Sequence, residues 1–144
     1  METSKPDQNI AAIYEDILAA EDSGIQVKRP LGDSEMATVY RRAKVHLYPI
    51  IANEVYCGTL AESQASGLPA VINAAGGGAD AARGRLRNGQ TGYFAPDESA
   101  FVNLTHGILS SGSGIYRTLH REALALQRQR SWEDAAIEFE AVWR

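Results

Sequence analysis

The sequence predicts an α/β fold of the Rossmann-like kind, with a mostly parallel sheet and helices on both of its faces. Short apolar segments of strand length alternate with amphipathic segments of helix length, and short loops rich in glycine and proline separate them. The chain has 144 residues, of which 44% are hydrophobic and 22% charged, and this fits one globular domain. We therefore expect residues 1–144 to form a single domain that ends in a helical tail from about residue 98 to 144.

The pattern of residues in the first part of the chain predicts a helix, then a strand, then a second helix. Apolar residues spaced by three and four positions predict a helix across residues 4–24, and Gly24 suits its exit. Residues 25–29 have the pattern of a short strand, which a loop at 30–33 closes. Asp33 is suited to cap a second helix, whose apolar stripe includes Tyr40.

The middle of the chain predicts two strands around a helix. Residues 44–50 form an apolar strand with Pro49 at its end, and residues 69–74 form another. A helix of about residues 58–66 lies between them and ends at Gly67. A glycine-rich loop at 76–78 follows, and residues 88–96 predict a turn and a short extended piece.

The tail predicts three helices. Two of them cover about residues 101–109 and 115–129, and a short hinge rich in serine and glycine joins them. The last helix opens with a capping box, in which Ser131 caps and Asp134 stands three positions later.

Composition excludes several classes of function. A net charge of −4 argues against a nucleic-acid-binding protein, and the basic residues Arg83, Arg85 and Arg87 fit a solvated turn. The one cysteine, Cys57, rules out an internal disulfide framework and fits a reducing compartment. No apolar run approaches the roughly 20 residues of a membrane span, and the polar N-terminus has no signal-peptide core. We expect a soluble, cytoplasmic protein without a transmembrane segment.

Most of the residues that could bind a ligand lie in the loops that should follow the strands. In open parallel sheets, ligands bind at this edge. Glu54 precedes the helix that starts near Gly58, and Glu62 lies about one turn inside it. The helix start offers free backbone N–H groups to a phosphate, and carboxylates accept hydrogen bonds from vicinal sugar hydroxyls. By spacing alone, ordinary exposed acids explain Glu54 and Glu62, and a ligand site is the alternative.

Other candidates stay open or are weaker. The loop at Gly76 and Gly77 either cradles a phosphate or sugar or simply turns tightly, and Asp80 either meets a ligand hydroxyl or caps the next turn. Cys57 fits a buried thiol better than a nucleophile, and His46 fits a packed or a surface side chain better than a ligand. No spacing suggests a metal site, a Walker lysine or a dinucleotide fingerprint.

Several motifs in order carry a resemblance to a known family. Pro49 ends a strand, Glu54 and Glu62 form an E-x7-E segment, and "SQASGLPAV" and "GGGAD" follow. This order resembles the donor-binding, C-terminal half of retaining glycosyltransferases of the GT-B fold, family 4, also called glycosyl transferases group 1. The resemblance covers roughly residues 25–144.

The resemblance implies a role for each matching residue. Glu62 binds the ribose hydroxyls of a nucleotide diphosphate sugar, and Glu54, the catalytic residue, contacts the donor sugar. Backbone N–H groups at Gly58, Thr59 and Leu60 hold the diphosphate or the sugar, and Leu31 lies beside the base. The implied reaction transfers the sugar with retention at the anomeric carbon and needs no metal and no cofactor besides the donor substrate.

Some features depart from the family pattern. Asp80 stands where the family often has glutamate, and Ser63 where it often has alanine. The family's acceptor half, and a strand with the Arg and Lys that neutralise the leaving diphosphate, would precede this chain. We therefore expect an N-terminally truncated domain that binds a nucleotide sugar weakly and transfers slowly or not at all alone. Its expected partner is an N-terminal acceptor-binding half or a second copy.

Two other functions compete with this one. The chain can instead be a catalytically silent nucleotide-binding or interaction module that pairs with another chain. An unrelated Rossmann-like hydrolase or reductase is disfavoured because the fingerprints of those enzymes are missing.

Overall fold

The computed structural model describes residues 12, 15–17, 19, 24–50, 54–74, 80–110, 112–127 and 131–143. Contacts divide the chain into two compact units, Met1–Gly32 and Asp33–Arg144, and we describe each by itself. In the first unit, residues 12, 15–17 and 19 are helical, as the sequence predicts, and the other positions of that helix lie outside the described residues. Gly24 adopts a left-handed conformation with φ of +85°, which suits a helix exit.

The strand expected at residues 25–29 does not form, and that prediction is wrong. These residues are neither helix nor strand, and Ile25 is 45% exposed. Alternation of apolar and polar side chains allows an extended backbone, but a strand also needs a hydrogen-bonded neighbour. The sheet of the described residues has three strands, and residues 25–29 are not among them. The loop at 30–33 therefore does not emerge from the end of a strand.

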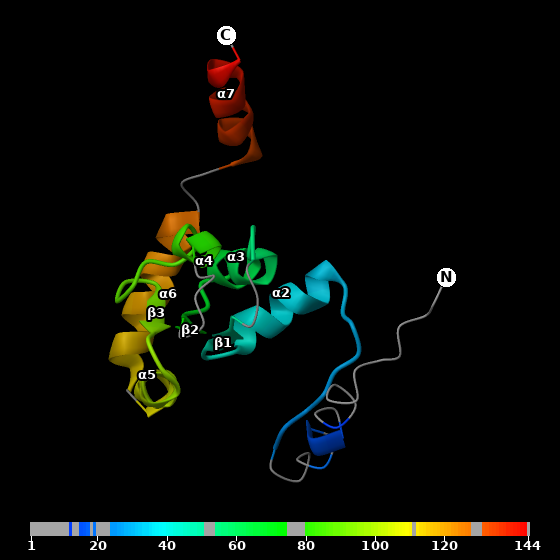
Figure 1. Cartoon of the computed structure of the whole chain (residues 1–144), viewed down its shortest axis with the longest axis vertical. Helices are drawn as coiled ribbons and strands as arrows, with labels where there is room; N and C mark the ends of the chain where they lie inside the picture. Colours follow the sequence, from blue (N-terminus) through cyan, green and yellow to red (C-terminus); the bar gives the residue numbers. More distant parts are fainter. Residues whose placement is uncertain are drawn as a thin grey trace. The chain divides into compact units, whose positions relative to one another are not determined.

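The second unit is built on a parallel sheet in the order β1-β2-β3, formed by β1 (His46–Pro49), β2 (Ala70–Asn73) and β3 (Gly92–Ala95) (Figure 1). The first three residues of the central strand β2 are fully buried, as expected for a parallel sheet covered on both faces. Gly92 belongs at its position because a Cβ there would lie 2.1 Å from the backbone oxygen of Ala70. All three strands lie within segments that the sequence predicts to be extended.

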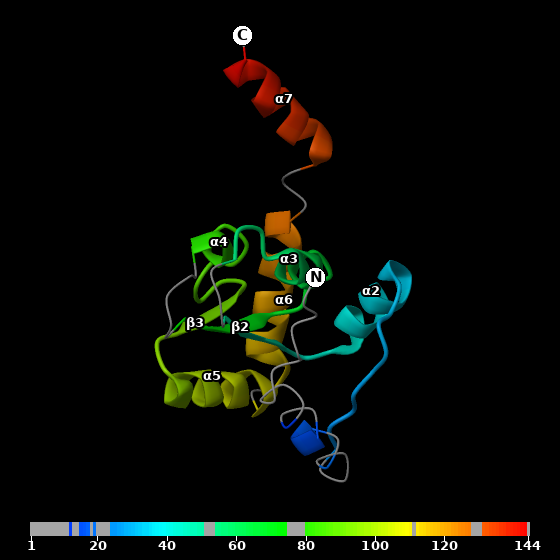
Figure 2. The same cartoon turned by 45° about the vertical axis from the view of Figure 1, so that its right-hand side comes forward.

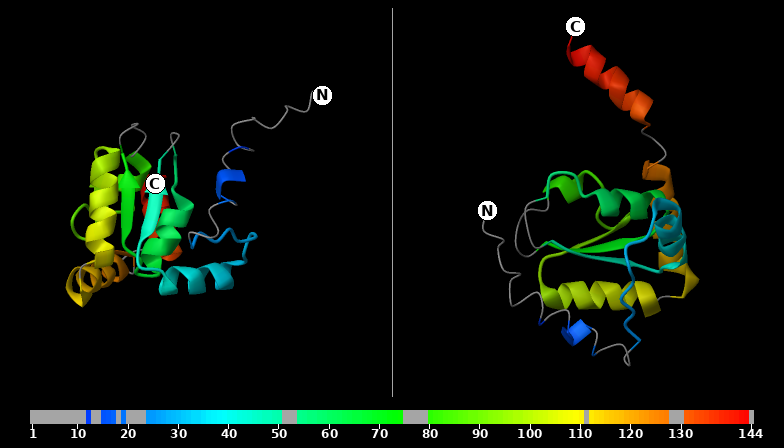
Figure 3. Two further views of the ribbon diagram at one scale, coloured as in Figure 1. Left: turned by 90° about the horizontal axis from the view of Figure 1, so that it is seen from below. Right: turned by 90° about the vertical axis from the view of Figure 1, so that its right-hand side faces the viewer.

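Helices cover both faces of the sheet, as the sequence predicts (Figures 2 and 3). On one face, α3 (Gly58–Ala65) and α4 (Asp80–Arg83) pack over β1 and β2 through a core that includes Leu60, Ile72 and Leu86. On the other face, α5 (Glu98–Ser110) and α6 (Ser113–Gln127) close a second core. A further helix, α2 (Asp33–Arg42), precedes β1 and contributes the buried Tyr40.

The end of α3 is fixed by glycine geometry and by α6. Gly67 has φ of +76°, and the backbone N–H groups of Gly67 and Leu68 donate to Gln64 and Ser63 in the pattern of a Schellman motif. His120 of α6 lies 2.7 Å from the Gly67 carbonyl oxygen through Nδ1. The predicted end of this helix at Gly67 is thus confirmed.

The last helix, α7 (Trp132–Val142), begins as the sequence predicts. The N–H of Asp134 donates to Ser131 Oγ at 3.1 Å, and the N–H of Ser131 donates to the Asp134 carboxylate at 2.7 Å. Both halves of the capping box are therefore present. In the part of the chain that the structure describes, no helix has the length and apolar character of a membrane span.

Candidate functional site

The candidate site lies where α3 begins, after the carboxyl end of β1. Cys57, the residue before α3, has a left-handed backbone with φ of 53°, and its side chain makes no capping hydrogen bond. A left-handed backbone costs a non-glycine residue about 1–2 kcal/mol, and such strain gathers at functional sites. The first intrahelical bond runs from the Ala61 N–H to the Cys57 oxygen. The N–H groups of Gly58, Thr59 and Leu60 therefore have no partner within the helix.

Glu54 lies in the loop before α3, and Tyr48 holds its carboxylate. Glu54 is exposed and has no regular secondary structure, but the Tyr48 hydroxyl of β1 donates a short hydrogen bond to Glu54 Oε2. Tyr48 itself is only 8% exposed. Burial raises the pKa of Tyr48 well above its ordinary value, and the bond to Glu54 raises it further. The hydroxyl therefore stays protonated and remains a donor.

Glu62 lies on α3, a little over one turn from its start, and meets a second tyrosine. The Tyr40 hydroxyl of α2 donates to Glu62 Oε2 at 3.4 Å, which is long for a hydrogen bond between oxygens. Burial raises the pKa of Tyr40, and the charge of Glu62 adds to this effect. Both glutamates of the E-x7-E segment are therefore exposed acids whose carboxylates contact a tyrosine hydroxyl.

His46 contacts the rings of both tyrosines, and it lies on the same face of the sheet as Tyr48. Its ring centroid is 6.0 Å from that of Tyr40 and 5.4 Å from that of Tyr48. Its Nδ1 lies 2.7 Å from the buried Ser63 Oγ of α3. Burial lowers the pKa of His46, which favours the neutral ring. His46 is thus a packed side chain, which is one of the two roles that the sequence predicts for it.

A cation also lies beside the start of α3. Arg85 donates from Nε to the Tyr56 backbone oxygen at 3.2 Å, and its guanidinium carbon lies 4.3 Å from the centre of the Tyr56 ring. Arg85 is therefore partly buried against the loop that carries Glu54. Arg85 lies in a turn, as the sequence predicts, and its contact with the loop after β1 is a further feature that the local sequence does not indicate.

Cys57 has the buried character that the sequence predicts. Its side chain is 2% exposed and belongs to the core under α3. Burial raises the pKa of the Cys57 thiol, which keeps the sulfur protonated and unreactive. Within the described residues, no group of three or more His, Cys, Asp or Glu side chains comes together as a metal site would require.

The structure describes some of the remaining predicted site residues near α3 and does not place others. Asp80 is the first residue of α4 and lies at the carboxyl side of β2, with its exposed side chain 3.8 Å from Arg83 Nε. Gly76 and Gly77 lie outside the described residues. Leu31 is part of the first unit and is not placed relative to α3. Gly58 leaves room for a side chain, because a Cβ there would meet only the Tyr56 ring, at 3.6 Å.

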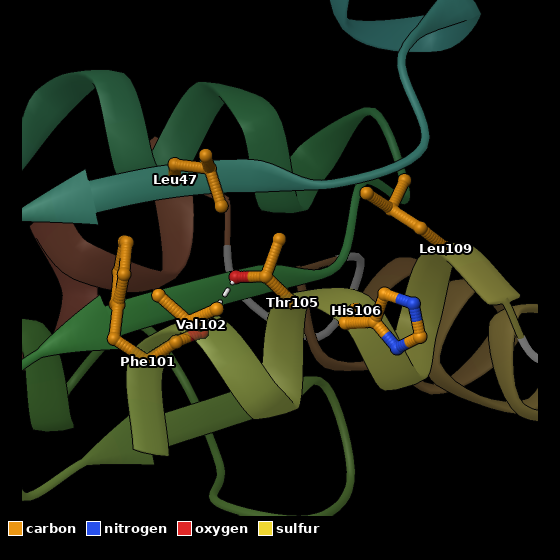
Figure 4. A pocket seen from close by; sticks show the side chains of 6 residues that line it. All are labelled: Leu47, Phe101, Val102, Thr105, His106 and Leu109. Carbon is orange, nitrogen blue, oxygen red and sulfur yellow. Dashed lines mark hydrogen bonds between the residues drawn. The ribbon is translucent and has the colours of Figure 1, made fainter. Parts of the chain in front are cut away.

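An apolar hollow of about 230 Å³ lies on the opposite face of β1, between Leu47 and α5 (Figure 4). Leu47 alternates with Tyr48 along the strand, and it lines the hollow together with Phe101, Val102 and Leu109 of α5 (Figure 4). The hollow is therefore separate from the two glutamates.

The sequence interpretation missed Tyr48, Tyr40 and Arg85. Strand alternation places Tyr48 on the same face as His46, so it could have indicated Tyr48 as a neighbour of the following loop. Tyr40 lies in an apolar stripe and has the signal of a core residue alone. Nothing in the local sequence indicates that Arg85 contacts a loop 29 positions away.

Comparison with known proteins gives the family. The family model described as glycosyl transferases group 1 matches residues 5–111, which is well over half of the chain. The chain belongs to the glycosyl transferases group 1. No curated protein and no solved structure matches it.

Membership in the glycosyl transferases group 1 supports transfer of a glycosyl group as the chemistry of this domain. The matched span includes α2, the sheet, α3 and α5, and hence both glutamates and both tyrosines described above. Helices α6 and α7 lie beyond it.

Proposed function

We propose that this chain is the donor-binding domain, corresponding to the C-terminal half, of a retaining GT-B glycosyltransferase of family 4. Its substrate would be a nucleotide diphosphate sugar, bound at the start of α3 without an obligatory metal or other cofactor. The observation that carries the proposal is one arrangement: an uncapped helix start lies between two exposed carboxylates, each contacted by a tyrosine hydroxyl.

Each part of this arrangement suits one part of the donor. The N–H groups of Gly58, Thr59 and Leu60, with the positive end of the α3 dipole, suit the diphosphate. Arg85 adds a positive charge beside the same loop. The Glu62 carboxylate suits the ribose hydroxyls, and Glu54, as the catalytic residue, suits the donor sugar.

The other residues have supporting roles in the proposal. Leu31 would lie beside the base, and the loop with Gly76 and Gly77, together with Asp80, would close around the diphosphate or the sugar. An N-terminal acceptor-binding half or a second copy of the chain would complete the enzyme.

Calorimetric titration tests the proposal. The wild-type chain is titrated with UDP, GDP and ADP and with a sugar conjugate of each, and compared with Glu62→Ala. Losing the charge-assisted hydrogen bonds to ribose should weaken binding about 10- to 100-fold. Glu98→Ala is the matched control, since Glu98 is also an exposed glutamate near a helix start but lies on α5.

The outcomes separate the candidate functions. Binding that is lost in Glu62→Ala and kept in Glu98→Ala supports a donor site. If neither the wild-type chain nor the variants bind any of these compounds, the donor site is excluded and an interaction module that pairs with another chain becomes the better explanation.

A further inference from the structure

Tyr48 is anchored more firmly than the glutamate that it contacts. It packs in the core with Cys57, Leu60 and Ile72, and it is only 8% exposed. Glu54 is an exposed side chain on a loop. A carboxylate in that setting samples several rotamers, and ordering it costs conformational entropy when a ligand binds. A hydroxyl that is fixed by the core removes part of that cost before the ligand arrives.

The hydrogen bond leaves Glu54 able to bind a ligand. The Tyr48 hydroxyl occupies one lone pair of Oε2, and a carboxylate has about four such acceptor sites. Acceptor sites of this carboxylate therefore remain for a ligand hydroxyl. Bonds from a hydroxyl to a carboxylate are among the stronger hydrogen bonds in proteins, and this one fixes the orientation of the acceptor as well as its position.

The contact at Glu62 has the same form but is weaker. The Tyr40 hydroxyl is 3.4 Å from Glu62 Oε2, and Glu62 is already held by the backbone of α3. The His46 ring contacts the rings of both Tyr40 and Tyr48, and His46 Nδ1 also contacts Ser63 of α3. The two tyrosines that contact the glutamates are thus linked to each other through His46.

We propose that Tyr48 is a positioning residue that orients Glu54 toward the donor sugar, and that Tyr40 does the same, less strongly, for Glu62 and the ribose. This inference rests on the proposed function, since it assigns each glutamate to a part of the nucleotide sugar. It predicts that the two tyrosine hydroxyls affect different parts of the ligand.

The test removes each hydroxyl and keeps each ring, with Tyr48→Phe and Tyr40→Phe. Each variant is titrated with UDP-glucose, GDP-mannose and ADP-glucose and with the matching nucleoside diphosphates. In Tyr48→Phe, affinity for the nucleotide sugar should fall about tenfold, while affinity for the free diphosphate stays unchanged. In Tyr40→Phe, both affinities should fall together, by about threefold. Tyr93→Phe is the control, because Tyr93 packs in the core on the other face of the sheet.

Failure of the positioning role differs from failure of the proposed function. If the wild-type chain binds a nucleotide sugar and Tyr48→Phe binds it equally well, the positioning role of Tyr48 is overturned while the donor site stands. If Tyr48→Phe weakens sugar and free diphosphate equally and also lowers the unfolding temperature, the tyrosine is merely structural and the inference is again overturned. A wild-type chain that binds none of the compounds overturns both proposals.

Discussion

At the scale of single residues, His46 makes stability depend on pH. Burial lowers its pKa in the folded protein below the value of about 6.5 expected in the unfolded chain. Below that pH the unfolded chain binds more protons than the folded one, so acid favours unfolding. The contribution of His46 to the free energy of unfolding should therefore be constant above about pH 6.5. It should fall as the pH drops below about 6.5.

Urea unfolding of the wild-type chain and of His46→Gln at several pH values from 7.5 to 5 measures this contribution. The wild-type chain should lose more free energy of unfolding on acidification than the variant does, because glutamine does not titrate. Other titrating groups are common to both proteins and cancel in the difference. Equal losses in the two proteins would show that His46 does not contribute.

The residues of the candidate site were only partly predictable. The spacing of Glu54 and Glu62 around a helix start is a local feature, and the structure confirms Glu54 in the loop and Glu62 inside the helix. Their tyrosine partners come from β1 and α2, and the Tyr40 contact spans 22 positions. Such pairs depend on how the elements pack, which periodicity does not encode.

At the scale of elements, the two glycines Gly67 and Gly107 should respond to alanine with opposite signs. At Gly67 the backbone is left-handed, and a Cβ would lie 2.5 Å from the His120 ring and 2.9 Å from Leu124 Cγ. We expect Gly67→Ala to destabilise the fold by about 2–4 kcal/mol, since it combines backbone strain with displacement of α6 from α3.

Gly107 is the matched control. It lies within α5, and a Cβ there would meet nothing within 4 Å. Gly107→Ala should therefore stabilise the fold by about 0.5–1 kcal/mol through helix propensity. Thermal and urea unfolding of both variants measures the two effects. A destabilising Gly107→Ala or a neutral Gly67→Ala would contradict the packing described here.

The predictability of the elements follows from whether their signals are local. The parallel strands, the end of α3 at Gly67 and the capping box of α7 each have a signal within a few residues, and each is confirmed. Residues 25–29 have the side-chain alternation of a strand but are not part of the sheet. The missing information there is the identity of a neighbouring strand, which the sequence of the segment does not contain.

At the scale of the whole molecule, the candidate site is open to water. Glu54, Thr59 and Glu62 are exposed, Tyr56 is 55% exposed, and the side chain of Asp80 is fully exposed. Under the proposed function, transfer requires that fixed groups stabilise the charge of the leaving diphosphate and that water is kept from the activated sugar. In an open site, water screens these charges and also competes with the protein for hydrogen bonds to the ligand.

We therefore expect this chain, under the proposed function, to bind a nucleotide sugar but to transfer the sugar at or near the background rate. Incubation of the chain with UDP-glucose, GDP-mannose or ADP-glucose, followed by detection of the released diphosphate, measures both transfer and hydrolysis. Glu54→Gln is the matched control, since it keeps the shape of the side chain and removes its charge. Steady-state release that is fast in the wild-type chain and lost in Glu54→Gln would contradict this expectation, because an open surface with Arg85 as its nearby cation would then suffice for catalysis. Release at background in both proteins, with binding retained by the wild-type chain, is the expected result. Under the proposed function, the start of α3 and its two carboxylates contribute to binding of the donor, whereas departure of the diphosphate requires a second surface that closes over the site.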